Sequence, residues 1–140
     1  MVLTAEDIMK PLPAFLSADT PVDVATRMMS EGKRGFILVS DNGALKGIVT
    51  EWDLIDKVYA KNLNPSEVKV SQIMTTELFS VTPETPTRKL TRLMAEKGVR
   101  RMLVGNGDKF VGIITSKDII RIFNDYAEIV ENIASKYGII

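Results

Sequence analysis

The amino-acid sequence repeats itself at a spacing of 65 residues, and this repeat constrains the fold more than any other feature. Residues 5–59 align without a gap to residues 70–124, and 15 of these 55 pairs are identical. Apolar positions and turn residues recur together in both copies. The repeat therefore predicts one structural unit copied in tandem, with the first copy at residues 1–61, a linker at 62–69 and the second copy at 70–140.

The apolar pattern of each copy predicts the order strand, helix, strand, strand, helix. A short apolar stretch comes first, at residues 14–16 and 79–81. A Thr-Pro pair then opens a helix, with threonine as the N-cap and proline at the first helical position. The inward faces of these helices are predicted to hold Ala25, Met28 and Met29 in the first copy and Leu90, Leu93 and Met94 in the second.

Two strands joined by a tight turn follow each of these helices. FILVS and RMLVG read as strands, and LKGIV and FVGII return beside them. Asn42-Gly43 is typical of a hairpin turn, Asn106-Gly107 is its shifted equivalent, and a second helix begins after each closing threonine. One such unit is too small for a self-sufficient core, so we expect an α/β protein whose two units pack through their sheets about an approximate two-fold axis, with clefts between them.

The final helix is predicted to be longer than its counterpart in the first copy. Its apolar stripe comprises Ile122, Tyr126, Ile129, Ile133 and Tyr137. Two interpretations remain open. The stripe packs on its own domain, or it forms a dimer surface or the start of a connection to a missing C-terminal domain.

Composition excludes several classes of function. The chain has 18 basic and 18 acidic residues, no cysteine and no histidine. A disulfide framework, a thiolate metal site and a histidine base are therefore absent, and no charge excess favours nucleic acid. The sequence contains no Walker loop and no G-x-G-x-x-G, so an enzyme is disfavoured and no metal site is expected. Without a membrane span or signal-peptide core, the expected location is the cytoplasm.

The segments GIVTEWD and GIITSKD carry the strongest candidate for chemistry, at Thr50 and Asp53 and at Thr115 and Asp118. Thr-x-x-Asp before a helix is the pattern of a capping box, which is a purely structural role. The same geometry also suits a ligand, because helix amides accept a phosphate and a carboxylate accepts hydrogen bonds from a ribose diol. The two roles are compatible.

The ordered set of Ile-Met, Thr-Pro before a helix with Met at its end, and Gly-h-h-Thr-x-x-Asp, found in both copies, resembles the CBS domain. Two in tandem resemble a CBS pair, or Bateman module. The resemblance implies two β-α-β-β-α units packed through their sheets with pseudo-two-fold symmetry. It also implies a regulatory sensor that binds AMP, ADP, ATP or S-adenosylmethionine in the clefts, with no obligatory cofactor, and that often forms dimers.

By this resemblance, the aspartate of each closing motif binds ribose, and its threonine contacts phosphate or ribose. Each cleft also takes residues from the opposite copy. The implied Asp118 cleft contains Thr115, Met9, Ala14, Gly35 and Phe36, and the Asp53 cleft contains Thr50, Met74, Phe79, Val99 and Arg101, with Ile48 and Ile113 near the base or sugar. Arg100 and Arg101, with Arg34 from across the cleft, favour the Asp118 cleft as the phosphate site. The alternatives are core packing for the apolar residues and a plain surface role for the arginines.

Some positions depart from the family pattern. Leu38 and Leu103 stand where many CBS units carry a proline, and Ser116 and Lys117 replace a frequent acidic-basic pair. These departures concern the identity of the ligand and leave the fold prediction unchanged. The competing hypothesis for function is a ligand-free module that dimerises or docks a regulated partner.

Overall fold

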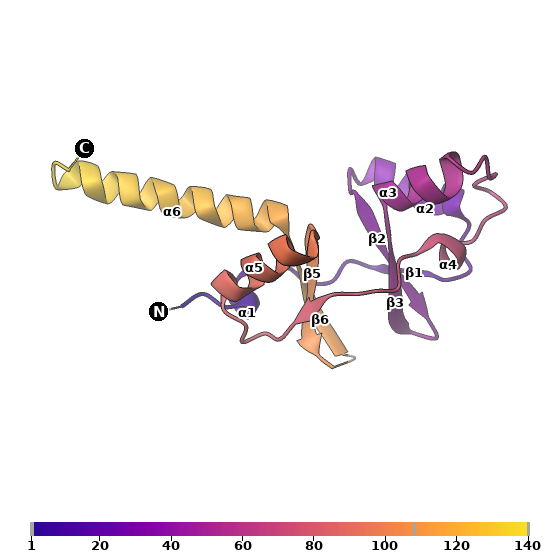
Figure 1. Cartoon of the computed structure of the whole chain (residues 1–140), viewed down its shortest axis with the longest axis horizontal. Coiled ribbons are helices and arrows are strands. Elements are labelled where there is room, and N and C mark those ends of the chain that lie inside the picture. Colours follow the sequence, from indigo (N-terminus) through magenta and orange to yellow (C-terminus); the bar gives the residue numbers. More distant parts are fainter. Residues whose placement is uncertain (1, 108, 140) are drawn as a thin grey trace. The chain divides into compact units, whose positions relative to one another are not determined.

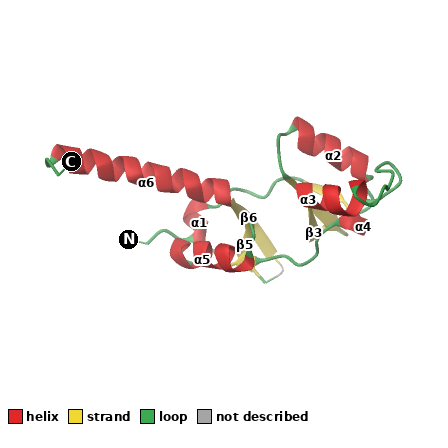
Figure 2. Cartoon of the chain, turned by 45° about the horizontal axis from the view of Figure 1, so that its top comes forward, coloured by secondary structure: helices red, strands yellow, loops and turns green. Residues whose placement is uncertain are grey.

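The computed structural model describes residues 2–107 and 109–139, and the chain forms two compact units. The first, here called the Asp53 unit, is Pro13–Leu78. The second, the Asp118 unit, combines Met1–Leu12 with Phe79–Ile140 (Figure 1). Each unit contains one sheet and its own helices (Figure 2).

Both units contain a strand, a helix, two strands and a helix in this order along the chain, and each has one further short helix. The Asp53 unit contains β1 (Phe15–Ser17), α2 (Val22–Glu31), β2 (Phe36–Asp41), β3 (Ala44–Thr50), α3 (Glu51–Leu54), the π-helical segment η1 (Ile55–Tyr59) and α4 (Val70–Ile73). The Asp118 unit contains α1 (Ala5–Ile8), β4 (Ser80–Val81), α5 (Thr87–Lys97), β5 (Arg101–Asn106), β6 (Lys109–Thr115) and α6 (Ser116–Lys136). The predicted α/β class is confirmed, and so is the order strand, helix, strand, strand, helix in each copy, whereas the short helices α1 and α4 that open the two copies were not predicted.

Each sheet has three strands with the same topology. β1 pairs in parallel with β2, and β2 pairs antiparallel with β3. β4, β5 and β6 repeat this arrangement. The register shifts at equivalent places, between Val39 and Ser40 and between Val104 and Gly105. The predicted Asn-Gly hairpin turn is confirmed in the first copy, where φ is 51° at Asn42 and 80° at Gly43.

The opening helix of each sequence copy packs into the unit formed by the other copy. Ala5 and Ile8 of α1 are buried in the same core as Leu90 of α5. Val70 and Ile73 of α4 are buried in the other core, with α2, β2 and β3. The structural units therefore differ from the division at residues 61 and 70 drawn from the repeat. The repeat could not reveal this exchange, because both copies carry the same apolar positions in their opening helices.

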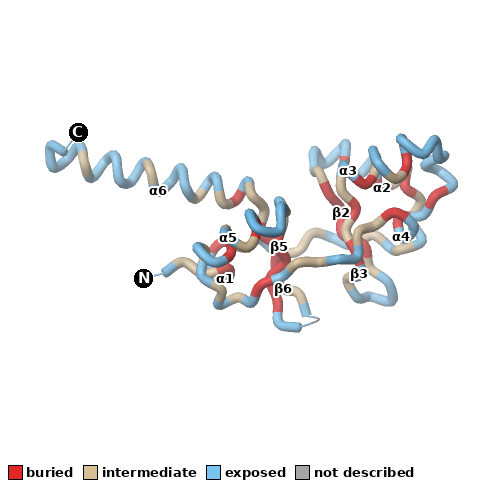
Figure 3. Tube along the Cα trace, in the orientation of Figure 1, coloured by how far each residue is buried: buried red, intermediate tan, exposed pale blue. Residues whose placement is uncertain are grey.

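The segments that run from α1 to Lys10 and from α4 to Thr75, here called the exchanged segments, are attached to the edges of the sheets by backbone hydrogen bonds. Lys10 and Ile113 exchange two such bonds of 2.9 Å each. Thr75 and Ile48 exchange two bonds of 2.8 and 3.0 Å. Each segment thus lies beside the outer strand, β6 or β3, just before that strand ends at its threonine. Figure 3 shows the buried residues gathered where helices meet strands within each unit.

A glycine in each outer strand makes this close approach possible. A Cβ atom on Gly112 would lie 2.5 Å from Met9 Sδ and 3.0 Å from the Lys10 carbonyl oxygen. A Cβ atom on Gly47 would lie 2.6 Å from Met74 Sδ and 3.0 Å from the Thr75 carbonyl oxygen. In each unit, the repeated glycine of one copy therefore packs against the repeated methionine of the other copy.

Gly112→Ala is expected to lower the free energy of unfolding by about 1–3 kcal/mol, because the added methyl group overpacks the contact with Met9. Urea denaturation measures the change. The double variant Gly112→Ala, Met9→Ala is expected to lose less than the sum of the two single variants, since the smaller side chain leaves room for the methyl group. Additive losses would contradict this account of the glycine.

Two details of the predicted helices are wrong. The N-cap positions of α2 and α5 are Pro21 and Pro86, without a side-chain cap, so the preceding threonines do not cap these helices. Proline has no amide hydrogen, and its fixed φ suits the turn before a helix as well as its first residue. Met28 is 45% exposed and lies outside the core, whereas Met29 is buried.

The predicted apolar stripe of α6 does not pack on its own unit along its whole length. Ile122 packs against the core of the Asp118 unit. From Phe123 onward the large apolar side chains are more than half exposed. The interpretation that the stripe packs on its own domain is therefore wrong beyond Ile122. Within the described residues, no helix combines the length and the apolar character that crossing a membrane requires.

Candidate ligand site

The Asp118 carboxylate is buried at the start of α6 and receives hydrogen bonds on both oxygens. Its Oδ2 accepts from the Thr115 amide at 2.9 Å and from the Thr115 hydroxyl at 3.0 Å. The Asp118 amide in turn donates to the Thr115 hydroxyl at 3.4 Å. The capping box expected from the sequence is therefore present. The carboxylate belongs to the first turn of a helix of 21 residues, where the helix dipole also favours a negative charge.

Two cations approach the other oxygen of Asp118. Lys10 Nζ lies 3.0 Å from Oδ1, and Arg121 donates to Oδ1 at 3.3 Å. Both cationic side chains are 54% exposed, whereas the Asp118 side chain is 2% exposed. Lys10 reaches this site because the exchanged segment pairs with the end of β6. A buried anion is thus flanked by two positive groups that remain in contact with solvent.

The surroundings of Asp118 favour its charged form. Burial alone would raise the pKa of this carboxyl group. The hydrogen bonds from Thr115 and the ion pair with Lys10 outweigh burial and hold the pKa below its usual value. The site therefore presents a carboxylate that is ionised at neutral pH, the form that accepts hydrogen bonds from a diol.

This lowered pKa predicts a specific acid sensitivity. A carboxylate whose pKa is lower in the folded state stabilises the protein above its unfolded pKa, and that stabilisation is lost as the pH falls through the folded pKa. The free energy of unfolding is measured by urea denaturation at a series of pH values from 6 downward. Below about pH 4 it is expected to fall more steeply for the unmodified protein than for Asp118→Asn. Parallel curves would contradict the lowered pKa.

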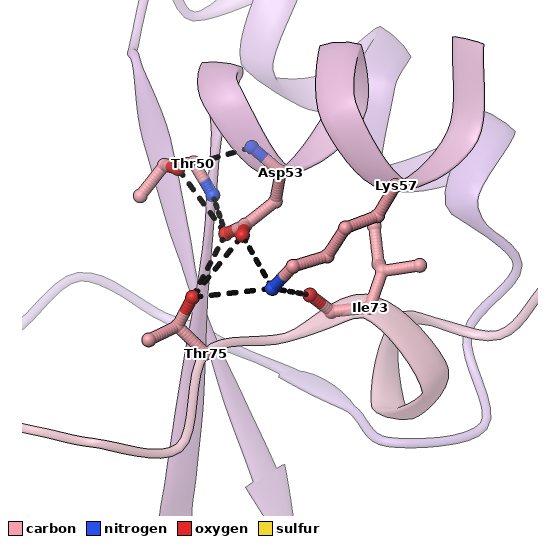
Figure 4. Close-up of polar contacts among 5 residues, drawn as sticks. All are labelled: Thr50, Asp53, Lys57, Ile73 and Thr75. Carbon is pink, nitrogen blue, oxygen red and sulfur yellow. Dashed lines mark hydrogen bonds and ion pairs between the residues drawn. The ribbon is translucent and has the colours of Figure 1, made fainter. Parts of the chain in front are cut away.

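The Asp53 carboxylate has the same capping box and a different set of further partners (Figure 4). Its Oδ2 accepts from the Thr50 amide at 2.8 Å and the Thr50 hydroxyl at 3.1 Å. Lys57 Nζ lies 2.8 Å from Oδ1, and the Thr75 hydroxyl donates to Oδ1 at 3.1 Å. Thr75 occupies the position of Lys10 in the repeat, so the equivalent residue supplies a hydroxyl here and an ammonium at Asp118.

The sixteen residues predicted for the two clefts divide evenly between the units. The Asp118 unit holds Met9, Phe79, Val99, Arg100, Arg101, Ile113, Thr115 and Asp118. The Asp53 unit holds Ala14, Arg34, Gly35, Phe36, Ile48, Thr50, Asp53 and Met74. Met9 thus lies in the unit of Asp118, and Met74 lies in that of Asp53. That residues of the two units come together in one cleft stays a prediction.

The arginines predicted to reach phosphate have local surroundings within their own units. Arg101 is the first residue of β5, and the Arg100 carbonyl accepts from the amide of Ser116, the first residue of α6. The Arg34 guanidinium lies 5.7 Å from the centre of the Phe36 ring, a cation–π contact. Arg100 therefore lies next to the start of α6 through its backbone, and Arg34 stays in the Asp53 unit.

Four residues that contact the aspartates are absent from the predicted site: Lys10, Lys57, Thr75 and Arg121. Two of them could have been found, because Lys57 and Arg121 stand four and three residues after their aspartates, on the same helix face. Lys10 and Thr75 follow the Ile-Met pair, and only the exchange of opening segments brings them to the carboxylates. Among the described residues, no group of three acidic side chains gathers as a metal site.

Comparison with known proteins agrees with this architecture. The family model of the CBS domain matches residues 5–60 and 70–125. The chain is 32% identical over 105 residues to an uncharacterized protein of Methanopyrus kandleri, an alignment that covers 74% of this chain and 54% of that protein. The chain thus spans about half of that relative's length.

Solved structures share this fold. The crystal structure of a protein named AcuB from Vibrio cholerae has a TM-score of 0.81 at 25% identity, with 94% of this chain and 98% of that chain covered. A hexameric CBS-CP12 protein from bloom-forming cyanobacteria has a TM-score of 0.73 at 33% identity, with 86% and 71% covered. This chain therefore belongs to the CBS-domain family and carries two CBS domains in tandem. CBS-domain pairs are generally regulatory and signal-transduction modules.

Proposed function

We propose that this protein is a regulatory sensor that binds an adenosine-containing ligand (AMP, ADP, ATP or S-adenosylmethionine) at Asp118. One observation carries the proposal: a buried, ionised carboxylate lies between two solvent-exposed cations at the first turn of a long helix. A ribose diol supplies two donors for the carboxylate, and a phosphate or carboxylate of the same ligand suits the cations and helix amides.

The residues near Asp118 fit such a ligand chemically. When the ribose hydroxyls donate to Asp118 Oδ1, they compete with Lys10 and Arg121 for this oxygen and weaken the two ion pairs. A phosphate on the same ligand replaces that partner, so no charge is left unpaired. Thr115 keeps the carboxylate in place through Oδ2 in either state. The contributions of Ala14, Gly35 and Phe36 from the other unit remain part of the proposal.

A regulatory role without catalysis is also part of this proposal. Asp118 is held by Thr115 and two cations, an arrangement that binds a sugar but offers no acid–base pair at a reacting atom. We also propose that the protein acts in the cytoplasm on a regulated partner, because a sensor needs a protein that responds to its ligand.

A thermal-shift series tests the proposed function. The protein is mixed with AMP, ADP, ATP or S-adenosylmethionine, and GMP and ribose 5-phosphate serve as controls for base and sugar phosphate. A ligand at a hundredfold excess over its dissociation constant stabilises the folded state by about 2.7 kcal/mol, a shift of several degrees in Tm. The absence of a shift with every adenosine compound would contradict the sensor proposal.

A second role is favoured by the exposed face of α6. Beyond Ile122, five large apolar side chains of α6 and that of Tyr137 at its C-cap are 52–72% exposed: Phe123, Tyr126, Ile129, Val130, Ile133 and Tyr137. If each exposes on the order of 100 Å² of apolar surface, together they offer roughly 600 Å² per copy. A standard interface buries about 800 Å² of each partner, which is a similar area. Three of the four charged residues between 123 and 137, Asp125, Glu128 and Glu131, are acidic and disfavour an anionic membrane. We propose that a second copy of the chain covers this face.

Ile133→Glu is expected to weaken this self-association at least tenfold, because it places a charge in the middle of an apolar interface. Asn132→Glu makes the same substitution on the polar side of the helix and is expected to have little effect. Sedimentation equilibrium measures both. A wild-type chain that stays monomeric at about 100 μM, well above the dissociation constant of a standard interface, would contradict the role of α6.

A further inference from the structure

Lys57 binds the Asp53 carboxylate with an ammonium group that has acceptors from three parts of the Asp53 unit. Its Nζ lies 2.8 Å from Asp53 Oδ1 and donates to the Ile73 carbonyl oxygen at 2.9 Å. A longer contact of 3.5 Å joins Nζ to the Thr75 hydroxyl. An ammonium group has three protons, and these three oxygens accept them (Figure 4).

Thr75 completes the polar contacts of Asp53. Its hydroxyl lies 3.1 Å from Asp53 Oδ1 and 3.4 Å from Oδ2. With Thr50 on Oδ2 and Lys57 on Oδ1, both oxygens have partners within the protein. A carboxylate has about four lone-pair positions. A ribose diol can therefore reach this carboxylate only by displacing a partner.

Displacement is harder at Asp53 than at Asp118. Removing Lys57 breaks its ion pair and also takes a donor from the carbonyl of Ile73, a residue that is 3% exposed. At Asp118 the cations are more exposed, at 54% against 38% for Lys57, and they contact the carboxylate from solvent. The two copies of one motif thus differ in how easily their carboxylates can be freed.

We infer that Lys57 is an internal lock that keeps the Asp53 carboxylate from ligands, so that each chain binds one adenosine ligand, at Asp118. The inference rests on the proposed function. It assigns Lys57 as the residue that sets the binding stoichiometry, and Lys10 and Arg121 as the cations that accompany the ligand.

Calorimetric titration of the full chain with AMP tests the lock. The unmodified chain is expected to bind one AMP. Lys57→Met keeps the aliphatic stem, removes the ammonium group and is expected to bind a second AMP with a dissociation constant within tenfold of the first. Lys61→Met, an exposed lysine of the same unit, is the matched control and is expected to bind one.

The outcomes separate the lock from the sensor proposal. Two AMP molecules on the unmodified chain, or one on Lys57→Met, would overturn the lock and leave the sensor proposal standing. No AMP on the unmodified chain would overturn the inferred binding of one AMP per chain, and the thermal-shift series with the other adenosine compounds would still test the sensor proposal. If Lys57→Met does not fold, Asp53→Asn replaces it: the lock predicts an AMP affinity within twofold of the unmodified chain, and a tenfold loss would overturn it.

Discussion

Deletion of residues 1–12 is expected to unfold the Asp118 unit, although these residues belong to the first copy in the sequence. The deletion removes Ala5 and Ile8 from the core and Lys10 from Asp118. Loss of a buried isoleucine alone costs about 2–5 kcal/mol, and a small domain has only about 5–15 kcal/mol to lose. Urea denaturation followed by circular dichroism is expected to show the helices of this unit melting far earlier than in the full chain.

The single tryptophan gives this experiment an internal reference. Trp52 lies in α3 of the Asp53 unit, so its fluorescence reports on the unit that keeps its core. Ile8→Ala is expected to lower the unfolding free energy by about 2–4 kcal/mol, and Val2→Ala, at an exposed residue of the same segment, by less than about 0.5 kcal/mol. A deletion variant with the urea midpoint of the full chain would show that the exchange is absent.

Asp118→Asn is expected to weaken AMP binding at least a hundredfold. The amide removes the negative charge that accepts hydrogen bonds from the ribose, and each hydrogen bond to a charged group contributes about 1.5–3 kcal/mol. Loss of the capping contact alone changes stability by only about 1 kcal/mol. Calorimetry and urea denaturation on the same variant therefore separate a ligand contact from a cap.

Asp7 provides a matched control for this substitution. Its carboxylate accepts from the Thr4 amide at 2.8 Å and from the Thr4 hydroxyl at 3.1 Å, which is the same cap at the start of α1. Asp7→Asn is expected to leave AMP affinity within twofold of the unmodified chain. Equal effects of the two substitutions on AMP affinity would indicate that Asp118 acts only as a helix cap and does not contact the ligand.

The sequence predicted the parts of the fold that depend on local patterns. The pair Asn42-Gly43 correctly predicted the hairpin turn, because only a few residue pairs readily adopt the positive φ angles that this turn requires. The apolar runs at FILVS and RMLVG gave β2 and β5. Thr50 and Asp53 gave the capping box, because its partners are three residues apart.

Features that depend on long-range packing could not be predicted. The repeat says nothing about which core receives α1, since Ile8 and Ile73 are equivalent in sequence. The role of Lys10 at Asp118 follows only from that exchange. The exposure of α6 beyond Ile122 also depends on where the core ends, and apolar spacing cannot indicate what lies opposite a helix.

The most direct test of the sensor proposal is a map of amide chemical shifts as AMP is added to the labelled chain. Saturable shifts are expected to centre on residues 112–118 and on Lys10, with small changes around Asp53. Saturation without shifts in these segments, or shifts confined to the exposed face of α6, would contradict the assignment of Asp118 as the ligand site.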